Sequence, residues 1–173
     1  MQKEIDSLKQ QAKEKLKENK KFLDRLRQKP PKHLDTIMQD LHTKTFNKVD
    51  CLECANCCKT TSPIVTDKDT QRIAKHLKMK AHAFEQRYLR VDEDGDTVFK
   101  NAPCEFLADD NYCLIYNVRP KACSEYPHTN RKKFHLINKI TLENTAVCPA
   151  TFKIVEKLKE KLHKPAKTQR TER

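Results

Sequence analysis

Glycine occurs once and tryptophan not at all among the 173 residues, and aromatic residues make up only 6% of the chain. Phosphate-binding loops and dinucleotide fingerprints each need several glycines, so the scarcity of glycine argues against both kinds of site. It also favours a mainly helical chain. Because 35% of the residues are charged, the apolar core must be thin. Metal binding is one way in which a chain with a thin core gains folding free energy.

A long apolar run is also lacking. No stretch approaches the ~20 apolar residues that a transmembrane helix needs, so the sequence predicts no membrane span. The N-terminus, residues 1–6, is charged and has no apolar segment of the kind found in signal peptides. These features predict a cytoplasmic protein, in which thiols stay reduced.

Eight cysteines are the feature that requires a chemical explanation. They are Cys51, Cys54, Cys57, Cys58, Cys104, Cys113, Cys123 and Cys148. Core packing accounts poorly for the four thiols within residues 51–58, whereas thiolate sulfur is a preferred ligand of zinc and of iron–sulfur clusters. Without a signal peptide, metal binding is favoured over a disulfide framework. We therefore predict that all eight cysteines are metal ligands.

The order of the cysteines allows more than one division between metal centres. Adjacent residues rarely bind the same tetrahedral ion, so Cys58 is predicted to serve a second centre or to bridge two. One division uses a ferredoxin-like spacing to hold a 4Fe–4S cluster and leaves four thiols for zinc or iron. Its two sets are Cys51, Cys54, Cys57 and Cys148, and Cys58, Cys104, Cys113 and Cys123. The main alternative is two zinc ions with four thiolates each, and other divisions, including one mononuclear iron, stay open.

Arg119 is the candidate site residue outside the cysteines. It precedes the predicted short helix that carries Cys123, where a guanidinium can donate to thiolate sulfur or bind an anionic ligand. No HxxxH or HxE pattern indicates an open zinc site with a general base, and no nucleophile–base pair is recognisable. The sequence therefore assigns no catalytic residue and leaves open whether the protein is an enzyme.

The net charge of +12 is concentrated near the two ends of the chain. Residues 1–30 and 151–173 each carry +5, whereas residues 31–150 carry +2. The chain is thus predicted to contain a basic amphipathic arm (1–30), a cysteine domain (31–150) and a C-terminal basic helix and tail (151–173). A nearly neutral cysteine domain is not typical of a phosphate-binding face, so nucleic acid is a less favoured partner. The N-terminal helix is predicted to pack on the domain or to bind a protein partner.

Hydrophobic periodicity and turn residues predict an α+β fold, mainly helical with a small hairpin, in which a compact metal-stapled domain is flanked by terminal helices. Helices are expected over 2–28, 33–45, 66–78 and 82–89, around Cys123, and from Cys148 onward. A turn at Gly95 is expected between short extended pieces, a hairpin over 104–116, and a further strand over 134–140.

The motifs together resemble those of a known family. They are Cys51-x-x-Cys54-x-x-Cys57-Cys58, Cys104-Glu-Phe-Leu, Cys113-Leu-Ile-Tyr, Arg119-Pro-x-x-Cys123 and the late Cys148. This order, over about residues 50–150, resembles the CxxCxxCC (YkgJ-type) cysteine-cluster family, a zinc- or iron-chelating domain. The resemblance implies metal chelation in a small cytoplasmic bacterial protein.

Two alternative functions remain open from the sequence. Flagellin lysine-N-methylases are distantly similar in their cysteine pattern, which implies an iron–sulfur enzyme that modifies lysines of a partner protein. The second alternative is a nucleic-acid-associated module that binds through its basic arms.

Overall fold

The computed structural model describes residues 2–163, which divide into two compact units. Unit 1 contains residues 49–128 together with the N-terminal residues up to Ser7. Unit 2 contains residues 8–48 and the described residues from Thr129 onward. Each unit has a hydrophobic core of its own, so the two are described separately.

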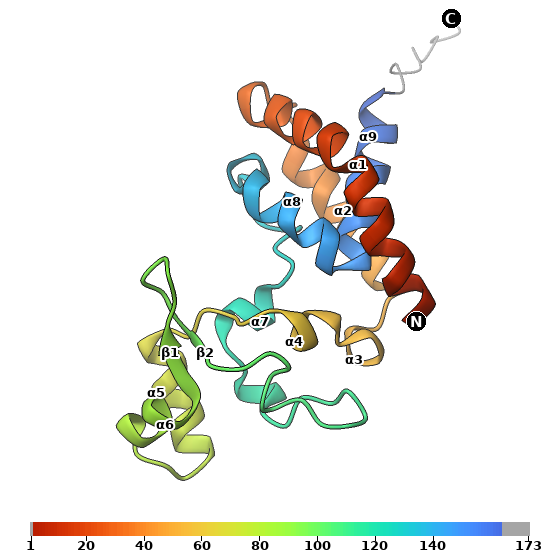
Figure 1. Ribbon diagram of the computed structural model, residues 1–173. Helices are drawn as coiled ribbons and strands as arrows, with labels where there is room; N and C mark the ends of the chain where they lie inside the picture. The colour runs from red at the N-terminus through yellow and green to blue at the C-terminus, as the bar shows by residue number, and fades with distance from the viewer. Residues whose placement is uncertain (1, 164–173) are drawn as a thin grey trace, which may run out of the picture. The chain divides into compact units, whose positions relative to one another are not determined.

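Unit 2 is built from helices that come from both ends of the sequence (Figure 1). They are α1 (Gln2–Gln28), of which residues from Leu8 belong to this unit, α2 (Leu34–Phe46), the 3-10 turn η2 (Phe134–Ile137), α8 (Asn138–Val147) and α9 (Pro149–His163). The periodic stripe predicted for residues 2–28 forms one continuous helix. Its end at Gln28 agrees with the predicted stop before Pro30 and Pro31.

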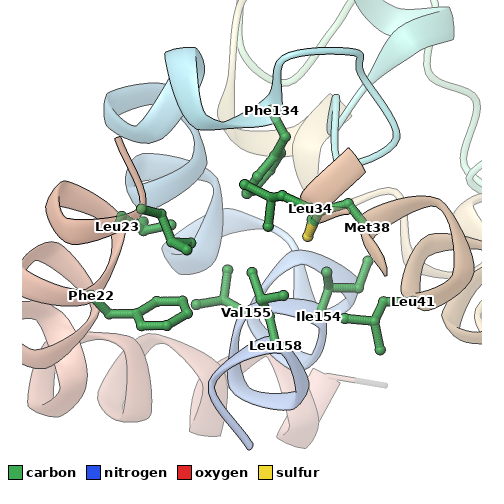
Figure 2. Packing of buried hydrophobic residues seen from close by; sticks show 10 residues of the cluster. Phe22, Leu23, Leu34, Met38, Leu41, Phe134, Ile154, Val155 and Leu158 are labelled. Carbon is green, nitrogen blue, oxygen red and sulfur yellow. The ribbon is translucent and has the colours of Figure 1, made fainter. Parts of the chain in front are cut away.

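The core of unit 2 is formed where the apolar faces of these helices meet (Figure 2). Its buried residues are Phe22, Leu23, Leu26, Leu34, Met38, Leu41, Phe134, Ile154, Val155 and Leu158. The members from α9 follow the 3–4 residue spacing of one helix face. A charged contact joins the same two terminal helices, because the ammonium of Lys159 donates to Asn19 Oδ1 at 2.8 Å.

Residues 134–140 are helical, so the predicted strand over this segment is wrong. The chain forms η2 and then enters α8. The buried residues Phe134, Asn138 and Thr141 follow helical spacing. The carboxylate of Asp35 on α2 accepts the backbone N–H groups of Lys133 (2.7 Å) and Phe134 (3.1 Å), and so caps this turn from another helix. A cap supplied from so far along the chain leaves no local sequence signal.

Unit 1 contains six short helical elements and a two-stranded sheet. The elements are α3 (Cys51–Cys54), α4 (Asn56–Thr60), α5 (Asp67–His76), α6 (Ala81–Tyr88), β1 (Leu89–Val91), β2 (Thr97–Phe99), the 3-10 turn η1 (Tyr116–Val118) and α7 (Lys121–Glu125). Strands β1 and β2 pair antiparallel, with Leu89 opposite Phe99, and the turn between them contains Gly95 at φ 84°. These strands are the short extended pieces that the sequence predicts around Gly95, and the mainly helical α+β class is confirmed.

The core of unit 1 lies between α5, α6, the sheet and the loop that follows it. Its buried members are Val65, Ile73, Ala74, Phe84, Leu89, Phe99, Phe106 and Ile115. Cys104 and Cys113 are partly buried against this cluster. The core therefore supports the segment on which two of the predicted ligands lie. None of the helices over residues 2–163 combines the length and apolar composition that a bilayer crossing requires.

Candidate metal centre

The first four cysteines lie on two single-turn helices with a sharp change of direction between them. Asp50 caps α3 by accepting the N–H of Leu52 at 2.8 Å. Ala55 then adopts a left-handed conformation (φ 45°), which ends α3 and begins α4. Cys51 and Cys54 are thereby separated from Cys57 and Cys58, which lie on α4. Cys51 is exposed, Cys54 is buried, and the two on α4 are half-buried.

Cys104 and Cys113 lie on the two sides of a hairpin loop. Leu107 pairs with Cys113 in an antiparallel bridge, and the N–H of Leu114 donates to the carbonyl of Phe106 at 2.8 Å. The N–H of Cys104 donates to the carbonyl of Cys58 at 2.8 Å. The predicted hairpin is therefore present in short form, and a backbone hydrogen bond joins it directly to α4.

Cys123 lies on α7, which begins after Pro120 as the sequence predicts. The position of this helix is fixed by Asp69, a buried residue of α5. The Asp69 carboxylate accepts the N–H of Lys121 at 3.1 Å and also closes the predicted capping box with Thr66. Sequence reasoning found the capping box but missed the link from Asp69 to α7, because no local pattern connects residues so far apart.

Cys148 is the predicted ligand that belongs to unit 2. Its N–H donates to the carbonyl of Asn144 at 2.8 Å at the end of α8, and Pro149 begins α9 immediately afterwards. The other seven cysteines belong to unit 1.

The pKa of the Cys58 thiol lies below those of Cys104, Cys113 and Cys123. A hydrogen bond from the neighbouring Cys57 thiol lowers the pKa of Cys58 to about 7, although burial opposes this change. A thiolate, rather than a thiol, is the form that binds a metal ion. Cys58 is therefore the thiol of this group that ionises most readily near neutral pH.

Three other thiols have pKa values shifted in the opposite direction. Burial raises the pKa of Cys104 to about 11 and that of Cys123 to about 12, and it also raises the pKa of Cys113. The charge of Cys58 adds to the increase at all three, and Cys104 and Cys113 add to it at Cys123. Electrostatic effects of this kind require short separations. Cys58 on α4, Cys104 and Cys113 on the hairpin loop, and Cys123 on α7 therefore influence one another electrostatically.

The donor chemistry of this group fits a thiophilic metal ion. Among residues 2–163, no three side chains of His, Cys, Asp or Glu already close around one point in coordinating geometry. Burial and mutual repulsion nevertheless disfavour the ionised form of these thiols. A bound dication would neutralise the charge of the thiolates and so favour that form. Four thiols are the ligand set that zinc and iron take in tetrahedral sulfur sites.

Arg119 lies beside the thiols, at the start of the segment that carries Cys123. Its guanidinium stacks on the ring of Tyr116 at 3.8 Å and donates to the Tyr116 carbonyl at 2.6 Å. Its own carbonyl accepts a hydrogen bond from Arg72 at 2.9 Å. Burial raises the pKa of Cys113 and Cys123, and the positive charge of Arg119 offsets part of that increase. Arg119 is therefore a cation that contacts with Tyr116 fix in place and whose charge acts on two of the thiols.

Comparison with known proteins agrees with the cysteine pattern. The profile of the CxxCxxCC family, described as a "Putative zinc- or iron-chelating domain", matches residues 50–149. The chain belongs to the CxxCxxCC family. The part that matches this family contains all eight cysteines and Arg119.

A curated relative is known from an archaeon. The chain is 34% identical over 82 residues to the "Uncharacterized protein MJ0661" of Methanocaldococcus jannaschii. The match covers 46% of this CxxCxxCC chain and 44% of the relative, so it spans less than half the length of that protein. No solved structure is significantly similar to the chain.

Proposed function

We propose that this CxxCxxCC protein binds zinc or iron in unit 1, with Cys58, Cys104, Cys113 and Cys123 as the four ligands of one ion. The proposal rests on the hydrogen bond from the Cys104 N–H on the hairpin to the Cys58 carbonyl on α4, and the effect of the Cys58 charge on the pKa of the other three thiols supports it. Family membership supports chelation of zinc or iron in general. Metal ligation by Cys51, Cys54, Cys57 and Cys148 stays a proposal from the cysteine pattern.

The chain's own residues have three tasks in such a centre. The core of unit 1 holds Cys104 and Cys113 at a fixed separation, and Asp69 holds the N-terminus of α7. Arg119 offsets part of the negative charge that four thiolates create. A bound dication would supply the remaining positive charge and, in a small domain, folding free energy.

The test is metal analysis on protein purified without oxygen, together with single and double cysteine variants. Cys58→Ser, Cys104→Ser, Cys113→Ser and Cys123→Ser should each lose the same one equivalent of metal. The double variant Cys104→Ser/Cys113→Ser should lose no more than either single variant, because the two thiols serve one ion. Losses that add in the double variant would show that the two thiols serve different ions.

The absorption spectrum distinguishes the candidate metals. A zinc protein is colourless, whereas an iron–sulfur protein is brown and contains acid-labile sulfide. Iron without sulfide indicates mononuclear iron. Full retention of metal in all four variants of Cys58, Cys104, Cys113 and Cys123 would reject the proposed ligand set. Lysine modification, nucleic-acid binding and a cytoplasmic location stay predictions from the sequence.

A further inference from the structure

One surface segment of unit 2 carries only positive charge. Between Glu125 and Glu143 the sequence contains no Asp or Glu. Within this interval Arg131, Lys132, Lys133 and Lys139 are all exposed. None of these four side chains forms an ion pair with a residue that the structure describes. Three cations of the terminal helices, Lys15, Lys20 and Lys159, are in contrast paired with carboxylates.

Two large aliphatic side chains project from the same segment. Leu136 is 56% exposed and Ile140 is 45% exposed. They are four residues apart where η2 continues into α8, so they lie on one face, together with Lys139. The opposite face is buried through Phe134, Asn138 and Thr141. The exposed face thus combines aliphatic and cationic side chains. The next acidic residue along the chain is Glu143 on α8.

The segment is held firmly in this orientation. Phe134 is 1% exposed and packs into the core of unit 2 beside Leu34 (Figure 2). Asp35 uses both of its carboxylate oxygens on the N–H groups of Lys133 and Phe134. This carboxylate is a negative charge next to the patch, but its lone pairs are directed at the backbone. The four cations and two aliphatic side chains are therefore presented by a fixed scaffold.

We propose that residues 131–140 form a docking surface for an anionic lipid bilayer. The four unpaired cations complement acidic headgroups, each contributing about fivefold to affinity near such a surface. Leu136 and Ile140 add apolar area that can enter the boundary between headgroups and acyl chains. A nucleic-acid backbone offers the same negative charge but nothing that would bury two aliphatic side chains. The apolar half of the surface therefore favours lipid.

The chain contains no tryptophan, which permits a direct test with one reporter per variant. Leu136→Trp and Ile140→Trp place a fluorophore on the patch. Val91→Trp is the matched control, because Val91 is a 66% exposed aliphatic on β1 followed by Asp92 and Glu93. With vesicles of phosphatidylcholine and phosphatidylserine, we expect a blue shift for the two patch variants and none for the control. Vesicles of phosphatidylcholine alone should give no shift.

Charge variants test the cationic half of the surface by vesicle sedimentation. Lys132→Gln/Lys139→Gln should lower affinity for the anionic vesicles about 25-fold. Lys68→Gln/Lys75→Gln removes the same charge from the exposed face of α5 and should change it far less. Equal losses in the two double variants would overturn the proposal, because binding would then follow net charge alone. Binding to RNA without any spectral shift of Leu136→Trp in the presence of vesicles would overturn it as well.

Discussion

Arg119 is the cation whose charge favours the thiolate form of Cys113 and Cys123. It stacks on Tyr116 and donates to a backbone carbonyl, and its charge offsets part of the increase that burial causes in the pKa of the two cysteines. A cation fixed in this way stabilises thiolates without being a ligand itself. Its role is separable from that of the cysteines, because removing it leaves every sulfur in place.

We therefore expect Arg119→Gln to weaken metal binding on the order of 10-fold while leaving the stoichiometry unchanged. The measurement is a competition titration against a chelator of known affinity. Arg87→Gln is the matched control, since Arg87 is also stacked on a tyrosine of unit 1, with its guanidinium 5.1 Å from the Tyr88 ring. If both variants weaken binding equally, the effect comes from general loss of stability and the role of Arg119 is refuted.

Asp69 is the second residue with a defined task. Burial opposes its ionisation, but hydrogen bonds from Thr66, Arg72 and the Lys121 N–H outweigh it and hold the pKa of Asp69 below its usual value. Asp69→Asn removes the charge from these contacts and should lower the free energy of unfolding by about 2 kcal/mol in urea denaturation. Asp67→Asn, at an exposed position in the first turn of the same helix, should cost much less.

The pH dependence of this effect has a definite sign. Because the pKa of Asp69 is lower in the folded chain, its contribution is complete above the unfolded pKa of about 4 and is lost as the pH falls below it. Asparagine has no charge to titrate. The stability difference between the wild type and Asp69→Asn should therefore narrow below about pH 4, and a constant difference would contradict this account.

At the level of secondary-structure elements, the terminal helices α1 and α9 meet around a buried ammonium. The Lys159 side chain is 9% exposed and contacts Glu18, Glu156 and the fully buried Asn19. Asn19 Nδ2 has no hydrogen-bond partner among the described residues. The amide of Asn19 therefore depends on Lys159 for its one hydrogen bond. Buried polar contacts of this kind are costly to break singly.

Lys159→Met should consequently lower the free energy of unfolding by about 1–3 kcal/mol, because Asn19 Oδ1 loses its donor. The double variant Asn19→Leu/Lys159→Met removes both partners and should recover most of that loss. Lys157→Met, at an exposed position two residues away, controls for the loss of positive charge. Thermal or urea unfolding of the wild type, these three variants and the single variant Asn19→Leu checks the prediction, and purely additive losses in the double variant would contradict it.

Elements with strong local signals were predictable from the sequence, and those that depend on distant residues were not. The stripe of α1 and the capping box of α5 are encoded within a few turns of chain. In contrast, η2 depends on Asp35 from α2. The break between α3 and α4 depends on a left-handed alanine, a conformation that alanine rarely adopts. The cysteine pattern indicated metal chemistry, but the hydrogen bond from the Cys104 N–H to the Cys58 carbonyl joins segments that no sequence signal connects.

At the scale of the whole molecule, the two units differ in what stabilises them. Unit 2 has ten buried apolar residues in one cluster, and these need no ligand. Unit 1 contains the four interacting thiols, and burial disfavours the thiolate form of three of them, Cys104, Cys113 and Cys123. Metal binding should therefore contribute folding free energy mainly to unit 1.

We expect removal of metal by a chelator to unfold residues 49–128 while unit 2 keeps its helices. Hydrogen exchange of the metal-loaded and chelated protein, read by mass spectrometry, measures this region by region. Protection should be lost in α5, α6 and the sheet, retained in α2 and α9, and restored when the metal is added back. Unchanged protection in unit 1 would mean that its core is sufficient alone. Equal loss in both units would mean that the chain unfolds as one cooperative body, in which case the stability of unit 2 would also depend on the metal.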